Sequence, residues 1–320
     1  MDKKRKKIKN FSGVTILVVG DVALDGYVRG NVERMSPEAP APVLLESSRK
    51  YELGCAANVA RNVASLGAKV ILAGVIGADV EGKLIRDMCK KSGIAMSFAI
   101  ERGRPTTVKT RIMNGRNQLV RVDREVATPI SKRAERELIS KISNVRSLDF
   151  VIVSDYRKGV LKKKLMGAIR KKWGGGKIIA DFKPAHSGFV RNVFAITPNL
   201  KETFEMTGLR AGTPSNARKA AKLLGARHGS SVVLKRGGRG ITVYEKSSGR
   251  FAHIPPRLVE VSDVTGAGDT VIAALALMCA IGSDLIEAAE FANSAAGIVV
   301  GKQGTATVTA QEIEQFKNGR

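Results

Sequence analysis

Short apolar runs alternate along this chain with longer stretches in which apolar residues recur at helical spacing. The first run, Val14–Val19, is continuous, as expected of a strand buried on both faces. Further strands are expected near residues 69–74, 149–153, 177–181, 193–197 and 230–235. Helices are expected near residues 80–91, 131–143, 161–172, 200–207, 215–227, 266–281, 284–301 and 309–317. Because strands that alternate with helices form a parallel sheet covered on both faces, the pattern predicts an α/β fold.

Two segments depart from this alternation and predict a small lid. The first, residues 27–50, contains three prolines and short alternating stretches, and the second, residues 95–123, begins with the strand-like stretch Ala95–Ile100. Strands that leave the main sheet and return to it produce such a pattern. We therefore expect one domain over residues 11–320 with lid strands in these two segments, preceded by a basic, disordered tail at residues 1–10.

Composition argues against several classes of protein. No apolar run reaches about 18 residues, so a membrane-spanning helix is not expected. The basic N-terminus is followed by an apolar run of only six residues, which is too short for a signal peptide. The three cysteines lack metal-ligand spacing, which favours a reducing, cytoplasmic setting, and the three histidines argue against a histidine-based metal site or triad.

The net charge of +25 predicts attraction to anions, so nucleic-acid binding must be considered. The basic residues, however, are scattered along helical stretches without interleaved aromatic side chains, and no zinc finger or RNA-binding aromatic motif is visible. Solvated basic faces are therefore favoured over a nucleic-acid site. The same field suits smaller anionic substrates such as nucleotides and sugar phosphates.

The segment Asp263–Thr270 carries the strongest chemical signal. It precedes an apolar helical run, and its two glycines allow backbone N–H groups to crowd at the start of that helix, where an anion can bind. Asp269 lies inside this positive pocket, which suggests a base that accepts a proton while the pocket neutralises a transferring group. The alternative is an ordinary helix start with an acidic residue favoured by the helix dipole.

Polar side chains also follow several of the expected strands. Asp21 and Asp25 come after the first strand, and Asp155 follows a later one; the others are Asn199, Glu202 and the loop Lys235–Gly240. Each can be explained by turns and helix caps, because Asn199 with Glu202 is itself a capping pattern. Since ligands bind at the carboxyl ends of parallel strands, their convergence on one rim predicts a site there.

Two further segments have open alternatives. In the small-residue helix Gly54–Ala64, Asn58 is either a hydrogen-bonded core amide or a ligand for substrate hydroxyls. In the lid, Lys109, Arg111 and Arg121 either form a charged edge that blocks aggregation or cover an anionic substrate.

These motifs resemble those of the ribokinase-like (PfkB) carbohydrate kinases, over almost the whole length from Val14 to Thr309. Asp263–Thr270 is similar to the C-terminal signature of that family, and Leu53–Gly67 to its N-terminal signature. The stretch Ser36–Pro40 is similar to the subgroup of D-glycero-β-D-manno-heptose 7-phosphate kinases. The resemblance implies a three-layer αβα sandwich with a mainly parallel sheet and a β-strand lid.

The resemblance also implies ATP-dependent phosphorylation of a sugar hydroxyl, with the product a heptose 1,7-bisphosphate. Asp269 would be the base, and the N–H groups of Gly266, Ala267 and Gly268 would form the anion hole. The sugar would be bound by Asp25, Asn58, Gly54 and Asp155, and its phosphate by Lys109, Arg111 and Arg121. The nucleotide would be bound by Asn199, Glu202, Lys235, Gly237, Gly240 and Asn293. Glu202 would also hold Mg²⁺ through water, and Asp263 and Thr265 would hold K⁺.

The chain departs from the family pattern at Cys55, where a second glycine is usual, and at Lys235, where Thr or Ser is common. It ends before an additional nucleotidyltransferase domain, which predicts the single-domain form. A homodimer through the lid strands is expected. Other activities stay open: a ribokinase, fructokinase or nucleoside kinase, or a kinase-fold regulator that binds sugar or nucleic acid without turnover.

Overall fold

The computed structural model describes residues 10–257 and 259–317, so the tail expected at residues 1–10 lies, apart from Asn10, outside the described residues. Within them, nine strands form the main sheet in the order β13-β12-β11-β10-β9-β8-β1-β4-β5. The strands are β1 Thr15–Gly20, β4 Lys69–Gly77, β5 Ala95–Glu101, β8 Phe150–Ser154, β9 Ile178–Asp181, β10 Ala195–Ile196, β11 Ser231–Lys235, β12 Ile241–Tyr244 and β13 Phe251–Ile254. Neighbours pair in parallel from β5 to β11, and the hairpin of β12 and β13 adds an antiparallel edge.

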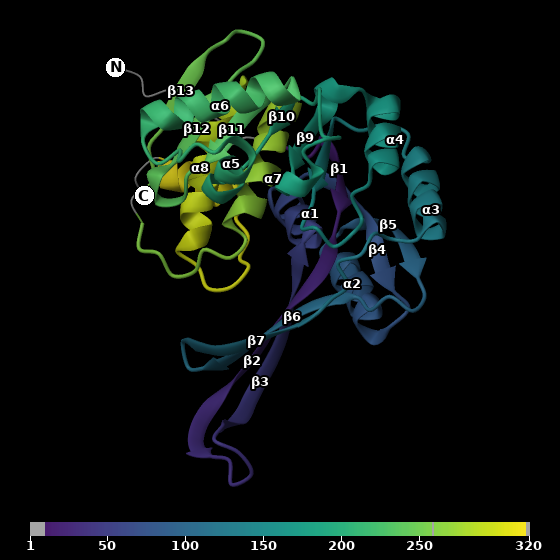
Figure 1. Cartoon of the computed structure of the whole chain (residues 1–320), viewed down its shortest axis with the longest axis vertical. Helices are drawn as coiled ribbons and strands as arrows, with labels where there is room; N and C mark the ends of the chain where they lie inside the picture. The colour runs from purple at the N-terminus through teal and green to yellow at the C-terminus, as the bar shows by residue number, and fades with distance from the viewer. Residues whose placement is uncertain (1–9, 258, 318–320) are drawn as a thin grey trace.

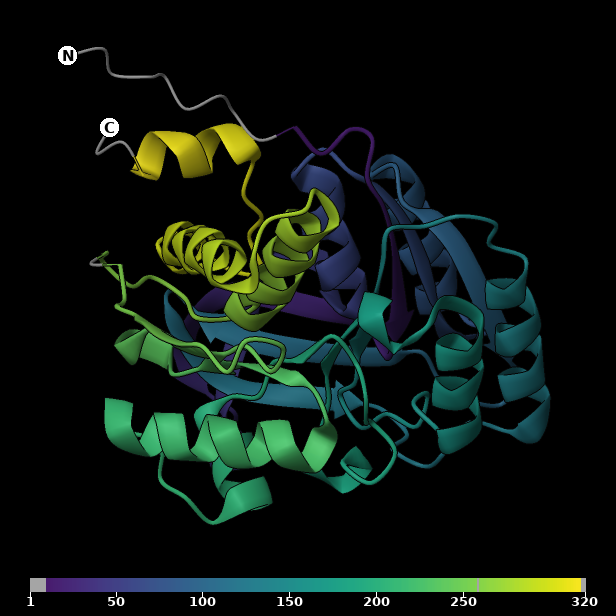
Figure 2. The same ribbon diagram turned by 90° about the horizontal axis from the view of Figure 1, so that it is seen from above.

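Helices cover both faces of this sheet (Figures 1 and 2). They are α1 Ala56–Ser65, α2 Val80–Lys91, α3 Lys132–Ser143, α4 Lys163–Trp173, α5 Leu200–Thr207, α6 Pro214–His228, α7 Ala267–Ala280, α8 Leu285–Val300 and α9 Ala310–Lys317. One apolar core unites α1, α2, α7, α8 and α9 with one face, and a second unites α3, α4 and α6 with the other. The predicted three-layer α/β architecture with a mainly parallel sheet is confirmed.

The lid is a separate sheet that projects away from the body of the molecule (Figure 1). Its order is β3-β2-β6-β7, formed by β2 Val22–Met35, β3 Pro42–Cys55, β6 Thr107–Asn114 and β7 Asn117–Arg124. The assignment of residues 95–101 to the lid is wrong, because β5 pairs in parallel with β4 at the edge of the main sheet. A short strand with one exposed face has the same alternating pattern at the edge of the main sheet as in the lid, so the sequence of β5 could not tell which sheet it joins.

Strand β2 is continuous between the core and the lid, which fixes the lid to the body. Its first seven residues, 22–28, are buried, whereas most of its last residues are exposed. Strand β3 runs antiparallel to β2 and returns the chain to the start of α1. Strands β2 and β3 therefore carry side chains both beside the main body of the molecule and in the projecting part of the lid. Among the described helices, none combines the length and the apolar character that a membrane crossing needs.

Candidate active site

Backbone N–H groups at the start of helix α7 have no acceptor among the described residues. Gly266 precedes the helix at φ 81°, and a Cβ there would lie 2.7 Å from Asn58 Nδ2, so both conformation and space require glycine. The N–H groups of Gly266 and Gly268 have no acceptor within the described part of the chain, whereas that of Ala267 donates to the carbonyl of Val264 at 3.3 Å. Two of the three predicted donors, those of Gly266 and Gly268, are therefore available for an anion, whereas that of Ala267 is engaged.

Asp269, in the first turn of α7, is buried and accepts two side-chain hydrogen bonds. The hydroxyl of Tyr156 donates to Oδ1, and Asn58 Nδ2 donates to Oδ2 at 2.7 Å. Burial raises the pKa of Asp269 from its ordinary 3.8 to about 6, although the two hydrogen bonds offset part of this effect. The carboxylate is thus ionised at neutral pH and basic enough to accept a proton.

Asp269 lines a cavity of about 180 Å³ at the carboxyl ends of the parallel strands. The cavity is lined by Asp155, Tyr156, Asp181, Lys183, Asn199, Glu202, Lys235, Gly266, Gly268 and Asp269. Its walls thus combine two free N–H donors, two lysines and several carboxylates. We call it the transfer cavity.

Two ion pairs form one wall of the transfer cavity. Lys235 Nζ lies 2.5 Å from Asp181 Oδ2, and 3.6 Å from the position that a Cβ on Gly268 would take. Lys183 Nζ lies 2.6 Å from Glu202 Oε1. Lys235 therefore places a cation beside the free N–H groups of α7, which strengthens the anion site.

Asn199 and Glu202 form a capping box at the start of α5. Asn199 Oδ1 accepts from the Glu202 N–H, and Glu202 Oε2 accepts from the Asn199 N–H, both at 2.9 Å. The capping interpretation of this pattern is therefore realised, and both residues still line the transfer cavity. A cap that also faces a cavity can serve both purposes.

The carboxylates of the transfer cavity fit a hydrated Mg²⁺. In the described residues no group of three or more His, Cys, Asp or Glu side chains is arranged to hold a metal. Mg²⁺, however, is commonly held by one or two carboxylates, its own waters and substrate phosphates. Glu202 and Asp181 supply two carboxylates in one cavity with an anion site, which matches that requirement.

Two of the predicted sugar-binding residues, Asp25 and Gly54, lie on the lid strands β2 and β3. Arg111 of β6 lies 2.7 Å from Asp25 Oδ1 on β2. A Cβ on Gly54 would lie 2.5 Å from Asp25 Oδ2, so glycine is required for this carboxylate to occupy its position. Asn58 is held by two partners, because its Oδ1 accepts from Arg61 at 3.0 Å while its Nδ2 donates to Asp269.

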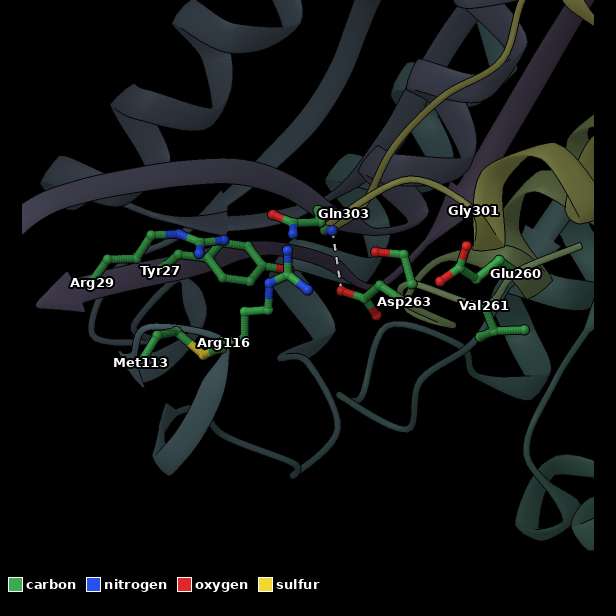
Figure 3. A pocket seen from close by; sticks show the side chains of 11 residues that line it. Tyr27, Arg29, Met113, Arg116, Glu260, Val261, Asp263, Gly301 and Gln303 are labelled. Carbon is green, nitrogen blue, oxygen red and sulfur yellow. Dashed lines mark hydrogen bonds between the residues drawn. The ribbon is translucent and has the colours of Figure 1, made fainter.

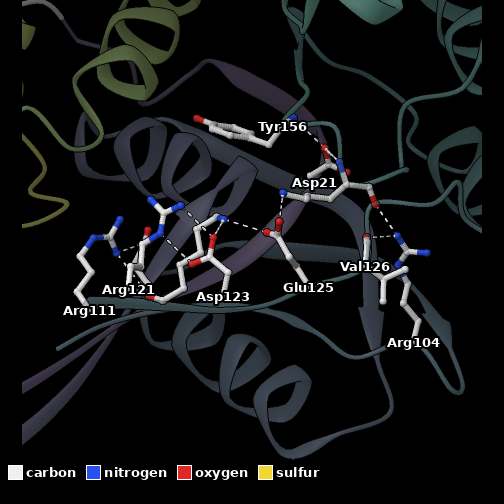
Figure 4. A network of polar contacts seen from close by, with 11 residues as sticks. Asp21, Arg104, Arg111, Arg121, Asp123, Glu125, Val126 and Tyr156 are labelled. Atoms are coloured by element: carbon white, nitrogen blue, oxygen red, sulfur yellow. Dashed lines mark hydrogen bonds and ion pairs between the residues drawn. The ribbon is translucent and has the colours of Figure 1, made fainter. Parts of the chain in front are cut away.

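The other predicted lid cations are engaged by carboxylates (Figure 4). Lys109 Nζ lies 3.0 Å from Asp123 and 2.9 Å from Glu125. Arg121 lies 2.9 Å from Asp123, and Lys158 lies 2.5 Å from Glu125. These pairs form a network across β6, β7 and the loop after β8, in which much of the positive charge is neutralised internally.

Two acidic residues at strand ends hold loops in place. Asp21 accepts hydrogen bonds from the N–H groups of Tyr156, Lys158 and Val160, which fixes the loop after β8. Asp155, predicted to bind substrate, accepts from the N–H groups of Arg157 and Lys183 and lies 2.7 Å from His186 Nδ1. Its side chain is fully buried and engaged, although the residue borders the transfer cavity.

The predicted nucleotide residues beyond Lys235 do not line the transfer cavity. Gly237 opens a single 3₁₀ turn, and Gly240 follows it at φ 78°. Asn293 of α8 is buried and donates to the carbonyl of Pro255 at 2.8 Å. These three residues border the region between β11, α8 and the β13 loop.

Asp263, predicted with Thr265 to bind a monovalent cation, accepts two backbone hydrogen bonds. The N–H of Thr265 donates to Oδ1 at 2.8 Å, and the N–H of Gly304 donates to Oδ2 at 3.1 Å. Asp263 faces a second, larger cavity on the lid side rather than the transfer cavity. Each carboxylate oxygen retains a free lone pair with which it can coordinate a cation.

The sequence did not assign site roles to Tyr156 and Lys183, which both line the transfer cavity. Tyr156 donates to Asp269, and Lys183 pairs with Glu202. A signal was present, because both residues come directly after β8 and β9, at the ends of parallel strands.

Comparisons with known proteins agree with this geometry. The family described as pfkB family carbohydrate kinase matches residues 15–312. The chain is similar to a protein named Bifunctional protein HldE from Azorhizobium caulinodans, with 39% identity over 303 residues, covering 93% of this chain and 63% of that protein. It is also similar to the Bifunctional protein HldE of Helicobacter pylori, with 41% identity over 308 residues, covering 95% of this chain and 66% of the relative. The chain thus spans less than two thirds of the length of the first of these relatives.

Solved structures share the fold. Phosphofructokinase-2 from Escherichia coli, in a structure described as a complex with potassium, has a TM-score of 0.77 at 19% identity and covers 96% of this chain and 98% of its own. Ribokinase from Thermotoga maritima has a TM-score of 0.74 at 22% identity and covers 95% of this chain and 99% of its own. The resemblance drawn from the sequence motifs is confirmed: the chain belongs to the pfkB family of carbohydrate kinases, ATP-dependent enzymes that phosphorylate sugars.

Proposed function

We propose that the protein transfers the γ-phosphoryl group of ATP to the anomeric hydroxyl of D-glycero-β-D-manno-heptose 7-phosphate. The observation that carries the chemistry is a buried carboxylate, Asp269, directly beside two free N–H groups at the start of α7. The choice of sugar rests on the stretch Ser36–Pro40 and on the similarity to proteins named HldE.

In the proposed step, Asp269 accepts the proton of the sugar hydroxyl as its oxygen bonds to the γ-phosphorus. The bond between that phosphorus and the oxygen bridging to the β-phosphate breaks, and ADP leaves with the electron pair. The N–H groups of Gly266 and Gly268, with the ammonium of Lys235, face the charge on the transferring group. Tyr156 and Asn58 orient the carboxylate through their hydrogen bonds.

The nucleotide phosphates would lie along the wall formed by Lys183 and Lys235. Mg²⁺, held by Glu202 and Asp181 directly or through water, would neutralise phosphate charge. The loop from Gly237 to Gly240 and Asn293 are our candidates for the ribose and adenine. Asp263 and Thr265 are our candidates for K⁺, supported by the low pKa of the Asp263 carboxyl, which backbone and side-chain hydrogen bonds hold down against burial.

The test is ADP release, measured by a coupled assay, with a panel of acceptors at equal concentration. Heptose 7-phosphate is expected to give the highest kcat/KM, above fructose 6-phosphate, ribose, fructose and adenosine. Faster turnover of an unphosphorylated sugar would refute the proposed substrate and leave the kinase assignment intact. Absence of ADP release with every acceptor, for a folded protein, would refute catalysis by the transfer cavity.

We also propose that two copies pair through their lids. Strands β3 and β7 are the edges of the lid sheet, and four apolar side chains on its strands are 49% to 58% exposed: Met35, Leu45, Val120 and Val122. A related fold is described as the tetrameric form of phosphofructokinase-2. Light scattering is expected to give the mass of a dimer for the wild type and of a monomer for Val122→Lys; a monomeric wild type would refute the pairing.

A further inference from the structure

The larger of the two cavities described above, about 460 Å³, lies between the lid and two loops of the main body (Figure 3). Tyr27 and Arg29 of β2 and Arg116 of the turn after β6 line it from the lid. The loops at residues 260–263 and 301–304 line it from the body. It shares no lining residue with the transfer cavity.

Two guanidinium groups in this cavity have no partner in the part of the chain that the structure describes. Neither Arg29 nor Arg116 has an ion pair or a side-chain hydrogen bond to any residue in the described ranges 10–257 and 259–317. This distinguishes them from Lys109, Arg111 and Arg121, which are each held by a carboxylate. Arginine side chains that are not engaged within the protein remain free to bind a ligand anion in a bidentate manner.

The Tyr27 hydroxyl provides an independent observation. It is buried, it belongs to a residue that lines the cavity, and it has no hydrogen-bond partner among the described residues. Burial raises the pKa of this phenol to about 12, so the hydroxyl remains protonated and can donate. Because a buried hydroxyl without a partner is costly, its position indicates a missing acceptor.

The strand register connects this cavity to the sugar site. Asp25, Tyr27 and Arg29 are spaced two residues apart in β2, so they lie on the same face of the strand. Tyr27 is paired in register with Arg111 of β6, whose guanidinium carbon lies 5.3 Å from the centre of the tyrosine ring. Four residues of strand separate Asp25 from Arg29 by about 13 Å. A sugar that is held at Asp25 with its long axis along β2 would place its far end toward Arg29.

Two acidic side chains also line the cavity, and backbone hydrogen bonds to one of them offset part of its charge. Both oxygens of Asp263 already accept backbone hydrogen bonds, from Thr265 and Gly304. Glu260 lines the opposite end, beyond Asp263 as seen from the two arginines (Figure 3).

We infer that Arg29, Arg116 and the hydroxyl of Tyr27 bind the phosphate group that the sugar substrate already carries. This assignment rests on the proposed function and extends it, because it explains how the enzyme selects a phosphorylated sugar. Two guanidinium groups and one hydroxyl supply donors for the oxygens of a phosphate dianion. The strand β2 then sets the distance between this phosphate and the reacting hydroxyl.

The test compares Arg29→Gln, Arg116→Gln and the double variant with the wild type, using heptose 7-phosphate and the same heptose without phosphate. Each single change is expected to lower kcat/KM for the phosphorylated sugar about 10- to 100-fold, the cost of one hydrogen bond to a charged group. The value for the unphosphorylated heptose should stay unchanged. Arg34→Gln is the matched control, because Arg34 is exposed on β2 and does not line the cavity.

Calorimetric titration with heptose 7-phosphate in the absence of ATP provides a readout besides activity. The double variant is expected to lose most of the affinity that the wild type and Arg34→Gln show. If the wild type strongly prefers heptose 7-phosphate and the double variant keeps that preference, the phosphate assignment is wrong and the proposed function stands. If the wild type prefers another phosphorylated sugar and the double variant loses that preference, the choice of heptose is wrong and the phosphate assignment stands. A wild type that prefers an unphosphorylated sugar overturns both.

Discussion

Replacing Asp269 by Asn tests both the chemistry and the electrostatics of the transfer cavity. The amide keeps the size of the side chain and can accept a hydrogen bond from Tyr156 or Asn58, but it cannot accept the sugar proton. Because general-base catalysis contributes about 10²- to 10⁴-fold, kcat is expected to fall by that factor. A coupled assay at saturating ATP and sugar measures the loss, and retention of more than a tenth of the activity would remove Asp269 from the role of base.

The same variant should change the pH dependence of stability. The folded pKa of Asp269, about 6, lies above its ordinary 3.8, so its contribution to the free energy of unfolding is present below pH 3.8 and is lost as pH rises through 6. The difference corresponds to about 3 kcal/mol. Relative to the wild type, the Asn variant should therefore gain up to about 3 kcal/mol between pH 4 and pH 8 in denaturant unfolding. An identical pH dependence of the two proteins would contradict the burial argument.

Three further changes address the surroundings of the base. Tyr156→Phe removes a donor that lowers the pKa of Asp269, so the acid limb of the kcat/KM profile, near pH 6 in the wild type, should move to higher pH; an unmoved limb would show that this hydrogen bond is absent in solution. Gly54→Ala brings a Cβ within 2.5 Å of the Asp25 carboxylate, so KM for the sugar should rise while KM for ATP stays constant, and equal changes in both would count against a local effect. Lys235→Met removes the cation beside the start of α7 and should lower kcat/KM for ATP about 10- to 100-fold; a smaller change than for the sugar would place Lys235 outside the nucleotide site.

The rim of the sheet could be predicted from the sequence because topology fixes it. Once strands and helices alternate, the ends of parallel strands meet at one edge, and Asp155, Asn199, Glu202, Lys235 and Asp269 do line one cavity there. The helix start at Gly266 could be predicted as well, because two nearby glycines before an apolar run are typical of a helix N-terminus with accessible N–H groups.

The partners of charged residues could not be predicted. Composition predicts a strong positive field, but Lys109 pairs with Asp123 of β7 and with Glu125 just after it, 14 and 16 residues further along. The sequence leaves the pairing of β7 open. Arg29 and Arg116 are also cationic, but they pair with none of the described residues. Whether a cationic side chain meets a carboxylate depends on strand register and on its rotamer, and the residues next to it in the sequence do not specify either.

Tyr156 shows a similar limit. Its place after β8 is visible in the sequence, but its donation to Asp269 joins residues 113 positions apart. The same holds for Asn58, where the sequence left a core amide and a ligand as alternatives. The structure shows a buried amide that is hydrogen-bonded to Asp269, as the first alternative has it, and the binding of substrate hydroxyls by Asn58 stays a prediction.

Phosphorus NMR of the product of heptose 7-phosphate and ATP tests the central claim most directly. A second sugar phosphate resonance, coupled to the anomeric proton, is expected to appear in a one-to-one ratio with ADP and to be absent with Asp269→Asn. ADP formed together with free inorganic phosphate, and no new sugar phosphate, would contradict the account.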